Sequence, residues 1–407
     1  MSSSEAMRTA RRLIEALHQR GMREGVLSPG SRSGPFALAL AAADAQGIVR
    51  LHVRIDEREA GFLALGLAKV SDRPVAVVTT SGTAVTNLHP ALLEASHTGV
   101  PLVAVSADRP ARLRGTGANQ TTNQIDLLPP VQTISTLDDL APIVCGPIHL
   151  NLELDQPLIE AGPWEFTVSD EPVSVAPASQ EPNVLAAGPL TVVIAGDDSP
   201  AEYAEIAATA GWPILAEPSS NLRSAPTAVA TGRLLLGAPH FADRIERVVS
   251  LGHATLSRPV TALLSRTDIP IVHVGEASTF PAPAGPNVSF HQAITAPAAD
   301  GGWAQEWIAA DEKLSQNLPA DEALSVAKIV GEAAAADAIL TLGPSQVLRD
   351  VDITLSTRGA LAKGVSNRGL AGIDGVLSTA IGATLAHGGQ GFAYLGDLTF
   401  LHGSNGL

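Results

Sequence analysis

The sequence predicts an α/β protein built on parallel sheets. Short apolar runs alternate with helical patterns along most of its 407 residues. Hydrophobic residues make up 45% of the chain and aromatic residues only 3%, so Ala, Val, Leu and Gly provide the packing, as they do in buried parallel strands. Charged residues reach only 16%, which indicates a globular chain. A chain of this length exceeds one typical core, and we expect two or three domains.

The first region, residues 1–165, alternates helix and strand. Ser4 can cap a helix through EAMRTARRLIEALHQR, and the strand GVLSP, a helix opening at Pro35 and the strand RLHVRI follow it. A helix begins near Glu57, VAVVTT is the next strand, a further helix comes after TTSGT, and PLVAVSADRP ends the series. The loops PGSRSG, TTSGT and SADRP all leave the carboxyl end of a strand. We therefore expect one ligand site at that edge of a parallel sheet.

Two more α/β regions are predicted, residues 186–310 and 320–407. A Pro-rich linker, SDEPVSVAPASQEPNV, leads to the strand LTVVIAGDD, whose GDD reads as a turn, and the region continues to PIVHVGEAS. The third region reads as the helix ALSVAKIVGEAAAA, the strand ILTLG, the loop PSQVLR, the segment GVSNRGLAGIDG, a helix ending near His387 and the strand FAYLGD.

Composition excludes several classes of protein. A net charge of −15 with no basic face argues against nucleic acid. The single cysteine, Cys145, excludes an intrachain disulfide and fits a reducing compartment; we expect it to be a small buried hydrophobe. No apolar stretch reaches membrane-spanning length, and the N-terminus lacks the apolar core of a signal peptide. We expect a cytoplasmic protein that does not insert into membranes.

Glu57 is the most informative single residue. It stands between a β-type run and an apolar helix, and the TTSGT turn and a distant Gly-Asp pair follow it. This combination indicates a split cofactor site, one half holding a heteroaromatic ring and the other a metal-bound diphosphate. The alternative is that Asp56, Glu57 and Glu59 only favour the helix N-terminus through the macrodipole.

Arginines in glycine-, serine- and asparagine-rich loops are the second signal. Arginine binds carboxylate and phosphate oxygens in a two-pronged manner, and the candidates are Arg32, Arg109, Arg349 and Arg368. Each could instead be solvated or form a structural ion pair. Asn119 and Gln120 add neutral hydrogen-bonding groups, whose alternative role is turn formation. The histidines form no metal or triad pattern, and neither G-x-S-x-G nor G-x-G-x-x-G is present, which argues against a serine hydrolase and a nicotinamide dehydrogenase.

Several long motifs, in order, resemble one family. They are SPGSRSGP, HVRIDEREAGFLALGLAK, TTSGTAVTNLHPALLEA, SADRPARLRGTGANQTTNQ, SNRGLAGIDGVLSTAIGA and GDLTFLH. They resemble the 2-succinyl-5-enolpyruvyl-6-hydroxy-3-cyclohexene-1-carboxylate (SEPHCHC) synthases, thiamin-diphosphate-dependent transferases of menaquinone biosynthesis. The resemblance is dense in the first and third regions and loose in the middle. It implies a thiamin-diphosphate-binding fold of three doubly wound parallel-sheet domains: pyrimidine-binding (1–165), central (186–310) and diphosphate-binding (320–407, incomplete).

The resemblance also implies a reaction and its cofactors. 2-Oxoglutarate would be decarboxylated and the resulting carbanion added to isochorismate, with thiamin diphosphate and Mg²⁺ (or Mn²⁺) as cofactors. Glu57 matches the catalytic glutamate that contacts the aminopyrimidine ring. The cofactor would lie between subunits, with Glu57 meeting Asp397 of a partner chain, so a homodimer or homotetramer is implied.

Site residues follow by motif match. The substrate-binding set is Ser31, Arg32, Arg109, Asn119, Gln120, Arg258, Ser345, Arg349 and Arg368. The cofactor-binding set is Glu57, Thr80, Ser81, Gly82, Gly396 and Asp397, with Asp397 also a metal ligand.

The sequence departs from the family pattern at three places. Ser257 stands where a basic residue often precedes the central arginine, and the connection after Gln124 is short. The family motif that opens at Asp397 closes with an asparagine much further along, and Asn405 is too close to be that ligand. We therefore expect a truncated, inactive form of a longer enzyme. Two alternatives stay open: an acetolactate-synthase-like enzyme, and a non-catalytic chain that binds dicarboxylates.

Overall fold

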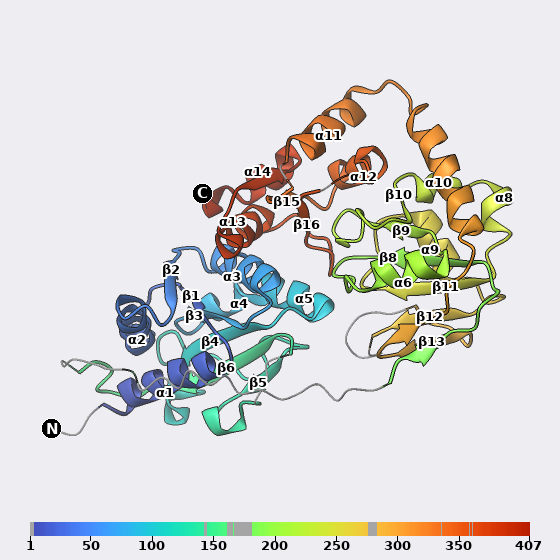
Figure 1. Cartoon of the computed structure of the whole chain (residues 1–407). Helices are drawn as coiled ribbons and strands as arrows, with labels where there is room; N and C mark the ends of the chain where they lie inside the picture. The colour runs from blue at the N-terminus through green and yellow to red at the C-terminus, as the bar shows by residue number, and fades with distance from the viewer. Residues whose placement is uncertain are drawn as a thin grey trace. The chain divides into compact units, whose positions relative to one another are not determined.

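The computed structural model describes residues 4–141, 145–160, 166, 181–275, 283–334, 336–357, 359 and 361–407. The chain folds into two compact units. The first combines Met1–Pro177 with Ile373–Gly388 and Leu398–Leu407, and the second combines Ala178–Gly372 with Gly389–Asp397. Most of the predicted linker falls outside the described residues. Figure 1 labels the elements used below.

The first unit is built on a parallel sheet of six strands in the order β2-β1-β3-β4-β6-β5. The strands are β1 (Glu24–Leu27), β2 (Arg50–Val53), β3 (Val75–Thr79), β4 (Leu102–Asp108), β5 (Gln132–Ile134) and β6 (Ile148–Glu153). The helices are α1 (Glu5–Gln19), α2 (Gly34–Ala45), α3 (Glu57–Ser71), α4 (Thr83–Thr86), α5 (His89–Thr98), α13 (Val376–His387) and α14 (Asp397–His402), with short 3₁₀ turns at Ala111–Leu113, Leu137–Asp139 and Ser404–Gly406.

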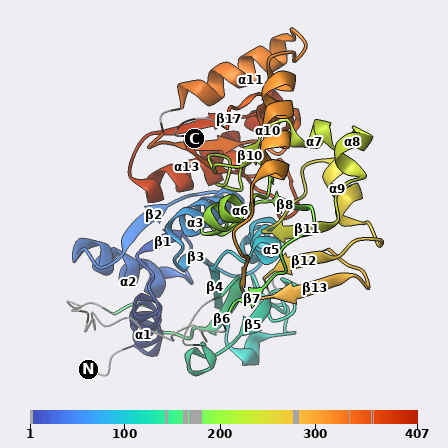
Figure 2. The same ribbon diagram turned by 45° about the vertical axis from the view of Figure 1, so that its right-hand side comes forward.

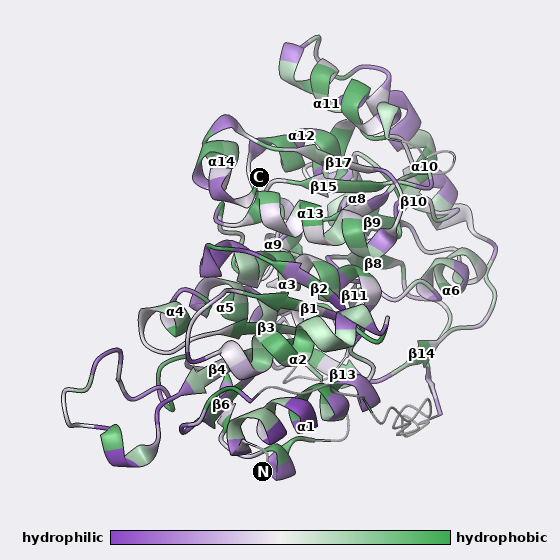
Figure 3. Cartoon of the chain, turned by 90° about the vertical axis from the view of Figure 1, so that its left-hand side faces the viewer, coloured by the Kyte–Doolittle hydropathy of each residue, from purple (hydrophilic) through white to green (hydrophobic). Residues whose placement is uncertain are grey.

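Local sequence explains these elements. The Ser4 hydroxyl accepts a hydrogen bond from the Met7 amide and caps α1, whose apolar stripe is fully buried. Every residue of β3 and of β4 is buried, as expected for central parallel strands covered on both faces. Figure 3 shows the hydrophobic colouring of β1 and β3. The predicted α/β fold with parallel sheets is confirmed.

Helix α13 packs along α3 at very short range, although more than 300 residues separate them in the sequence (Figure 1). A Cβ atom on Gly66 would lie 2.1 Å from the carbonyl oxygen of Thr379, and one on Gly382 would lie 2.2 Å from the carbonyl oxygen of Leu63. The two backbones can approach this closely only because glycine has no side chain. The α13 segment is therefore an integral part of the first unit.

The second unit contains a parallel sheet of six strands in the order β10-β9-β8-β11-β12-β13, a pair β14-β7 and a three-stranded sheet β16-β15-β17. Figure 2 shows β11, β12 and β13 side by side. The strands are β7 (Asn183–Val184), β8 (Thr191–Ala195), β9 (Ile214–Ala216), β10 (Ala228–Val229), β11 (Arg247–Leu251), β12 (Ile271–Val274), β13 (Val288–His291), β14 (Ile294–Thr295), β15 (Ile339–Leu342), β16 (Lys363–Val365) and β17 (Gly391–Tyr394).

The helices of this unit are α6 (Tyr203–Ala210), α7 (Gly232–Leu235), α8 (Pro239–Ala242), α9 (Arg258–Leu264), α10 (Gly302–Ser315), α11 (Glu322–Ala333) and α12 (Gln346–Thr354). One local prediction was wrong: PSQVLR is a loop only as far as Ser345, since α12 begins at Gln346. The reason is visible in the burial of Leu348 and Val351, which give the segment an apolar helical face.

Two further findings complete the fold. Cys145 is exposed, so its expected burial was wrong. No helix in the described ranges combines the length and the apolar character needed to cross a membrane.

Candidate active site at the carboxyl edge of the first sheet

Three loops expected at one edge of the first sheet do meet there. They follow β1, β3 and β4, which are neighbours in the sheet. The Ser28 amide donates to the Val78 carbonyl at 2.9 Å, and a Cβ on Gly30 would lie only 2.5 Å from Cβ of Thr80. The PGSRSG loop therefore packs directly against the start of the TTSGT turn, leaving no room for a side chain at Gly30.

The loop after β4 returns across the TTSGT turn. The Ser81 hydroxyl donates to the Gln120 carbonyl, and Nε2 of Gln120 donates to the Ser81 carbonyl, each at 2.9 Å. Gln120 adopts a φ of 59°, and Gly82 a φ of 79°. These left-handed conformations cost free energy outside glycine, so the two reciprocal bonds hold a strained residue in place. Gln120 thus bonds to the predicted cofactor turn, and both Gln120 and Asn119 beside it are exposed residues.

Arg32 and Arg109 approach each other at this edge. Burial is the main cause of a lowered pKa for Arg32, and the positive charge of Arg109 lowers it further, while Asp155 and Asp108 oppose the shift. Arg32 donates to the Leu154 carbonyl. The Nε atoms of both arginines are buried and have no hydrogen-bond partner within the described structure. Two adjacent guanidinium groups with unused donors are suited to an anion. Ser31, next to Arg32, is exposed.

Glu57 occupies the first position of α3, but it does not cap the helix. That role belongs to Asp56, whose Oδ1 accepts from the amides of Arg58 at 3.0 Å and Glu59 at 3.2 Å. Glu59 is fully buried and bound to the Ser378 hydroxyl at 2.6 Å. The half-buried Glu57 carboxylate accepts one long bond, 3.4 Å, from Nδ2 of Asn87. Of the three acids, Glu57 is therefore the one whose charge is available for a ligand.

The second unit holds the other predicted residues. Arg258 is exposed at the first position of α9, and the largely buried Arg368 donates to the Thr255 hydroxyl at 2.7 and 3.2 Å, just upstream of it. Ser345 precedes α12 without capping it through its side chain. Arg349 lies on α12, not in a loop as predicted, and donates to Oε1 of Gln346 at 2.9 Å. The structure therefore brings Arg368 to the Arg258 segment, and Arg349 is held on its own helix.

The buried Glu217 accepts a hydrogen bond from the Leu256 amide at 2.8 Å, two residues before Arg258 in the sequence. Burial raises the pKa of Glu217 to about 8, because the charged carboxylate is poorly solvated there. This hydrogen bond anchors the segment that leads into α9 to a buried carboxyl group. Ser257, the departure from the family pattern, is buried and its hydroxyl has no partner in the described residues.

Gly396 and Asp397 follow β17, and Asp397 begins α14. Where the structure describes the chain, no group of three or more His, Cys, Asp or Glu side chains is arranged to hold a metal ion. A metal bound through Asp397 would therefore need other oxygen donors, such as backbone carbonyls, waters or cofactor phosphates.

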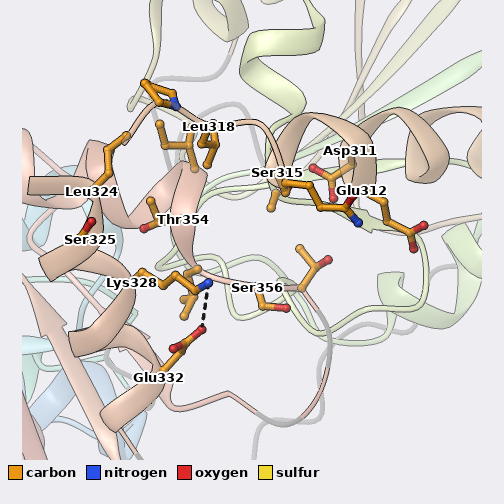
Figure 4. Close-up of a pocket in the computed structure, with 16 residues that line it drawn as sticks. Asp311, Glu312, Ser315, Leu318, Leu324, Ser325, Lys328, Glu332, Thr354 and Ser356 are labelled. Atoms are coloured by element: carbon orange, nitrogen blue, oxygen red, sulfur yellow. Dashed lines mark ion pairs between the residues drawn. The ribbon is translucent and has the colours of Figure 1, made fainter. Parts of the chain in front are cut away.

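Two features of the second unit lie away from the predicted residues. A cavity of about 510 Å³ is lined by α10, α11 and the end of α12, and includes the Lys328–Glu332 ion pair (Figure 4). None of the predicted site residues lines it. The GDD segment is a turn, as expected, and Asp197 pairs with His253 in a β-bridge between the ends of β8 and β11. A Cβ on Gly196 would lie 2.1 Å from the Ala254 amide nitrogen, so the backbone after β11 packs directly on this glycine.

Sequence reasoning missed a set of buried polar residues behind the first site. They are Ser106, Asp108, Gln124, His149 and Asn151, and all are almost fully buried. The available signal was polar residues at alternate positions of two apolar strands, VAVSAD and IHLNLE, which pair in register at Ser106 and Asn151. His149 has hydrogen-bond partners on both ring nitrogens, Ser106 and Thr133, and so has a satisfied structural role.

Comparison with known proteins agrees with the geometry. Residues 7–127 match the model of the thiamine pyrophosphate enzyme N-terminal TPP binding domain. A SEPHCHC synthase of Nocardioides sp. is 47% identical, with 99% of this chain and 79% of the relative covered. Those of Kineococcus radiotolerans and Renibacterium salmoninarum are each 42% identical; the alignments cover 100% and 99% of this chain and 80% and 78% of the relatives.

This similarity extends over nearly the whole chain and includes the Glu57 helix, the TTSGT turn and the arginine loops. It shows a thiamin-diphosphate-dependent enzyme of menaquinone biosynthesis. The chain belongs to the 2-succinyl-5-enolpyruvyl-6-hydroxy-3-cyclohexene-1-carboxylate synthase family.

Proposed function

We propose that the protein decarboxylates 2-oxoglutarate and joins the remaining four-carbon unit to isochorismate, giving SEPHCHC. The observation that carries this proposal is the pair Arg32 and Arg109, whose buried Nε atoms lack partners in the described structure. Both substrates are dicarboxylates, and a carboxylate placed between two guanidinium groups satisfies these donors and relieves their mutual repulsion. Ser31, Asn119 and Gln120 would add neutral hydrogen-bonding groups to the same substrate site.

Glu57 would hold the cofactor ring. When bound, thiamin diphosphate supplies the nucleophilic thiazolium carbon and the electron sink for decarboxylation. The Glu57 carboxylate fits this group, because Asp56 has taken over the helix cap and the bond from Asn87 is long. Its carboxyl group would form a hydrogen bond with the aminopyrimidine ring at the first turn of α3. Thr80, Ser81 and Gly82 would line the same cofactor, and the tight packing of Gly30 on Thr80 keeps that turn rigid.

The second unit would supply the remaining groups. Arg258, Ser345, Arg349 and Arg368 would bind substrate carboxylates. Gly396 and Asp397 would bind the cofactor diphosphate, with Asp397 a ligand to Mg²⁺ or Mn²⁺, hard cations that prefer oxygen. Because the family places its cofactor between subunits, we expect a homodimer or homotetramer in the cytoplasm, with Glu57 meeting the diphosphate-binding residues of a partner chain.

The test is release of carbon dioxide from 2-oxoglutarate by the full-length protein, measured with and without isochorismate and with Mg²⁺ and thiamin diphosphate supplied. Release that requires isochorismate, together with formation of SEPHCHC, is the expected result. Pyruvate serves as the matched control substrate, since it lacks the second carboxylate. Equal turnover with pyruvate and no need for isochorismate would indicate an acetolactate-synthase-like enzyme and overturn the proposal.

A further inference from the structure

A continuous chain of buried hydrogen bonds runs from the Asp108 carboxylate to the backbone amide of Gly82. Nδ2 of Asn151 donates to Oδ2 of Asp108 at 2.9 Å, and Nε2 of Gln124 donates to Oδ1 of Asn151 at 2.8 Å. The Gly82 amide then donates to Oε1 of Gln124 at 2.9 Å. The three side chains are almost completely shielded from solvent. We call this chain of bonds the relay.

The two ends of the relay fix its direction. An ionised carboxylate can only accept hydrogen bonds, and a backbone N–H can only donate. Turning the Asn151 amide would place its oxygen against Asp108, and turning the Gln124 amide would place its NH₂ group against the Gly82 N–H. Either change would leave buried polar groups unsatisfied, which is costly. The relay therefore has one arrangement.

Ser106 and His149 hold Asn151 from the side. The Ser106 hydroxyl donates to Oδ1 of Asn151 at 2.8 Å and lies 2.7 Å from Nε2 of His149. Because its single proton points to Asn151, Ser106 accepts from His149, whose proton is therefore on Nε2. Nδ1 of His149 is left to accept from the Thr133 hydroxyl at 3.1 Å. Burial lowers the pKa of His149 to about 4, so this support is neutral at physiological pH.

The relay ends at both candidate binding loops. At one end, Oδ1 of Asp108 accepts from the amide of Arg109 at 2.7 Å, where the arginine loop begins. At the other end, Gly82 is locked into the turn that exchanges two bonds with Gln120. The loop that carries Gln120 is the same loop that supplies Gln124. Fixing Gln124 therefore fixes both sides of the turn.

We propose that Gln124 is a positioning residue: through the relay it sets the conformation of the Ser81–Gly82 turn and of Gln120, and couples both to the backbone at Arg109. This rests on the proposed function only in assigning the turn to the cofactor and Gln120 to substrate. The conformational part is a property of the protein without ligands.

The first experiment measures residue-resolved amide hydrogen exchange in the full-length protein without cofactor or substrate. In Gln124→Met, which keeps the volume and removes the side-chain hydrogen bonds to Gly82, Asn151 and Ser106, protection of the Gly82 amide should fall about tenfold or more. Protection within β3 and β4 should stay as in the wild type. Gln132→Met, the same replacement at an exposed position on β5, is the matched control and should change nothing at Gly82. Unchanged Gly82 protection, or an equal loss throughout the sheet, would overturn the proposal.

A second variant tests the direction of the relay. In Gln124→Glu, the neutral acid can accept from Gly82 and donate its O–H to Asn151, whereas the ionised form places two acceptors against each other. Burial raises the pKa of such an acid. Gly82 protection, relative to wild type at the same pH, should be near normal in acid and fall as the pH rises. The charged or titratable groups around the relay are Asp108 and His149 and, behind them, Arg114 and Glu153. All four are present in both proteins, so their own titration cancels in the ratio of variant to wild type. A pH-independent ratio would refute the proposed direction, and neither exchange result depends on catalytic activity.

Discussion

The crossing of α3 and α13 gives the sharpest test of the packing. In Gly66→Ala, the new Cβ atom would lie 2.1 Å from the Thr379 carbonyl oxygen, whereas real Cβ atoms essentially never come within 3.0 Å of a neighbour. The helices must therefore separate by about 0.9 Å or more, and both contacting groups are backbone that cannot rotate away.

The free energy follows from two opposing terms. Forced overpacking costs roughly 1–3 kcal/mol, and the upper end applies here because a whole helix must move. Alanine returns about 0.5–1 kcal/mol through its better helix propensity. We expect the first unit to lose about 2 kcal/mol of unfolding free energy.

The assay is urea unfolding followed by far-ultraviolet circular dichroism, with hydrogen exchange of α3 and α13 peptides to locate the change. Gly61→Ala is the matched control on the same helix, since its Cβ would lie 3.0 Å from the Ala91 Cβ and needs only a few tenths of an ångström. That variant should stay within about 1 kcal/mol of wild type. Equal stability of the two variants would show that α13 does not pack on α3 as described.

Three further predictions concern the site. Glu57→Gln should nearly abolish turnover of the full-length enzyme at an unchanged thermal midpoint, because Asp56 provides the helix cap; near-normal turnover would return Glu57 to a structural role. Arg109→Lys should raise the Michaelis constant of a dicarboxylate substrate by the equivalent of about 1.5–3 kcal/mol, because the point charge of lysine cannot make the two-pronged contact. An unchanged Michaelis constant together with unchanged turnover would remove Arg109 from the site. His149 has a folded pKa of about 4 against an ordinary value of 6.5, so the unfolded chain binds its proton first. The contribution of neutral His149 to the unfolding free energy is therefore present above pH 6.5 and is lost as the pH falls toward 4, by about 3 kcal/mol in all. Over that range, the unfolding free energy of wild type should decline relative to that of His149→Gln. Parallel pH profiles of the two proteins would contradict the burial argument.

The sequence allowed the parallel sheet and its ligand edge to be predicted, because strand and helix periods are local signals. The meeting of PGSRSG, TTSGT and SADRP followed from the rule that parallel strands place their carboxyl ends together. The start of α12 was missed, since a Pro-Ser pair reads equally well as a loop or as the residues before a helix. Arg349 consequently lies on a helix.

Other features could not be predicted from local pattern. Nothing in the sequence around Gly66 or Gly382 indicates that these two helices pack against each other, since a glycine inside a helix has many explanations. The relay depends on side chains from three separated segments, and Gln124 read only as part of a polar loop. Long-range geometry determines both features, whereas propensity and periodicity describe near neighbours along the chain.

The place of α13 in the first unit has a practical consequence for dissecting this enzyme. The first compact body is discontinuous in sequence, because Ile373–Gly388 and Leu398–Leu407 belong to it. A recombinant fragment that stops at the predicted boundary of residue 165 would expose the bare groove at Gly66 and the apolar surface of Phe62 beside it, where Gly375 now packs. Such a fragment should precipitate or self-associate. A fusion that appends both Ile373–Gly388 and Leu398–Leu407 through flexible linkers should remain monodisperse.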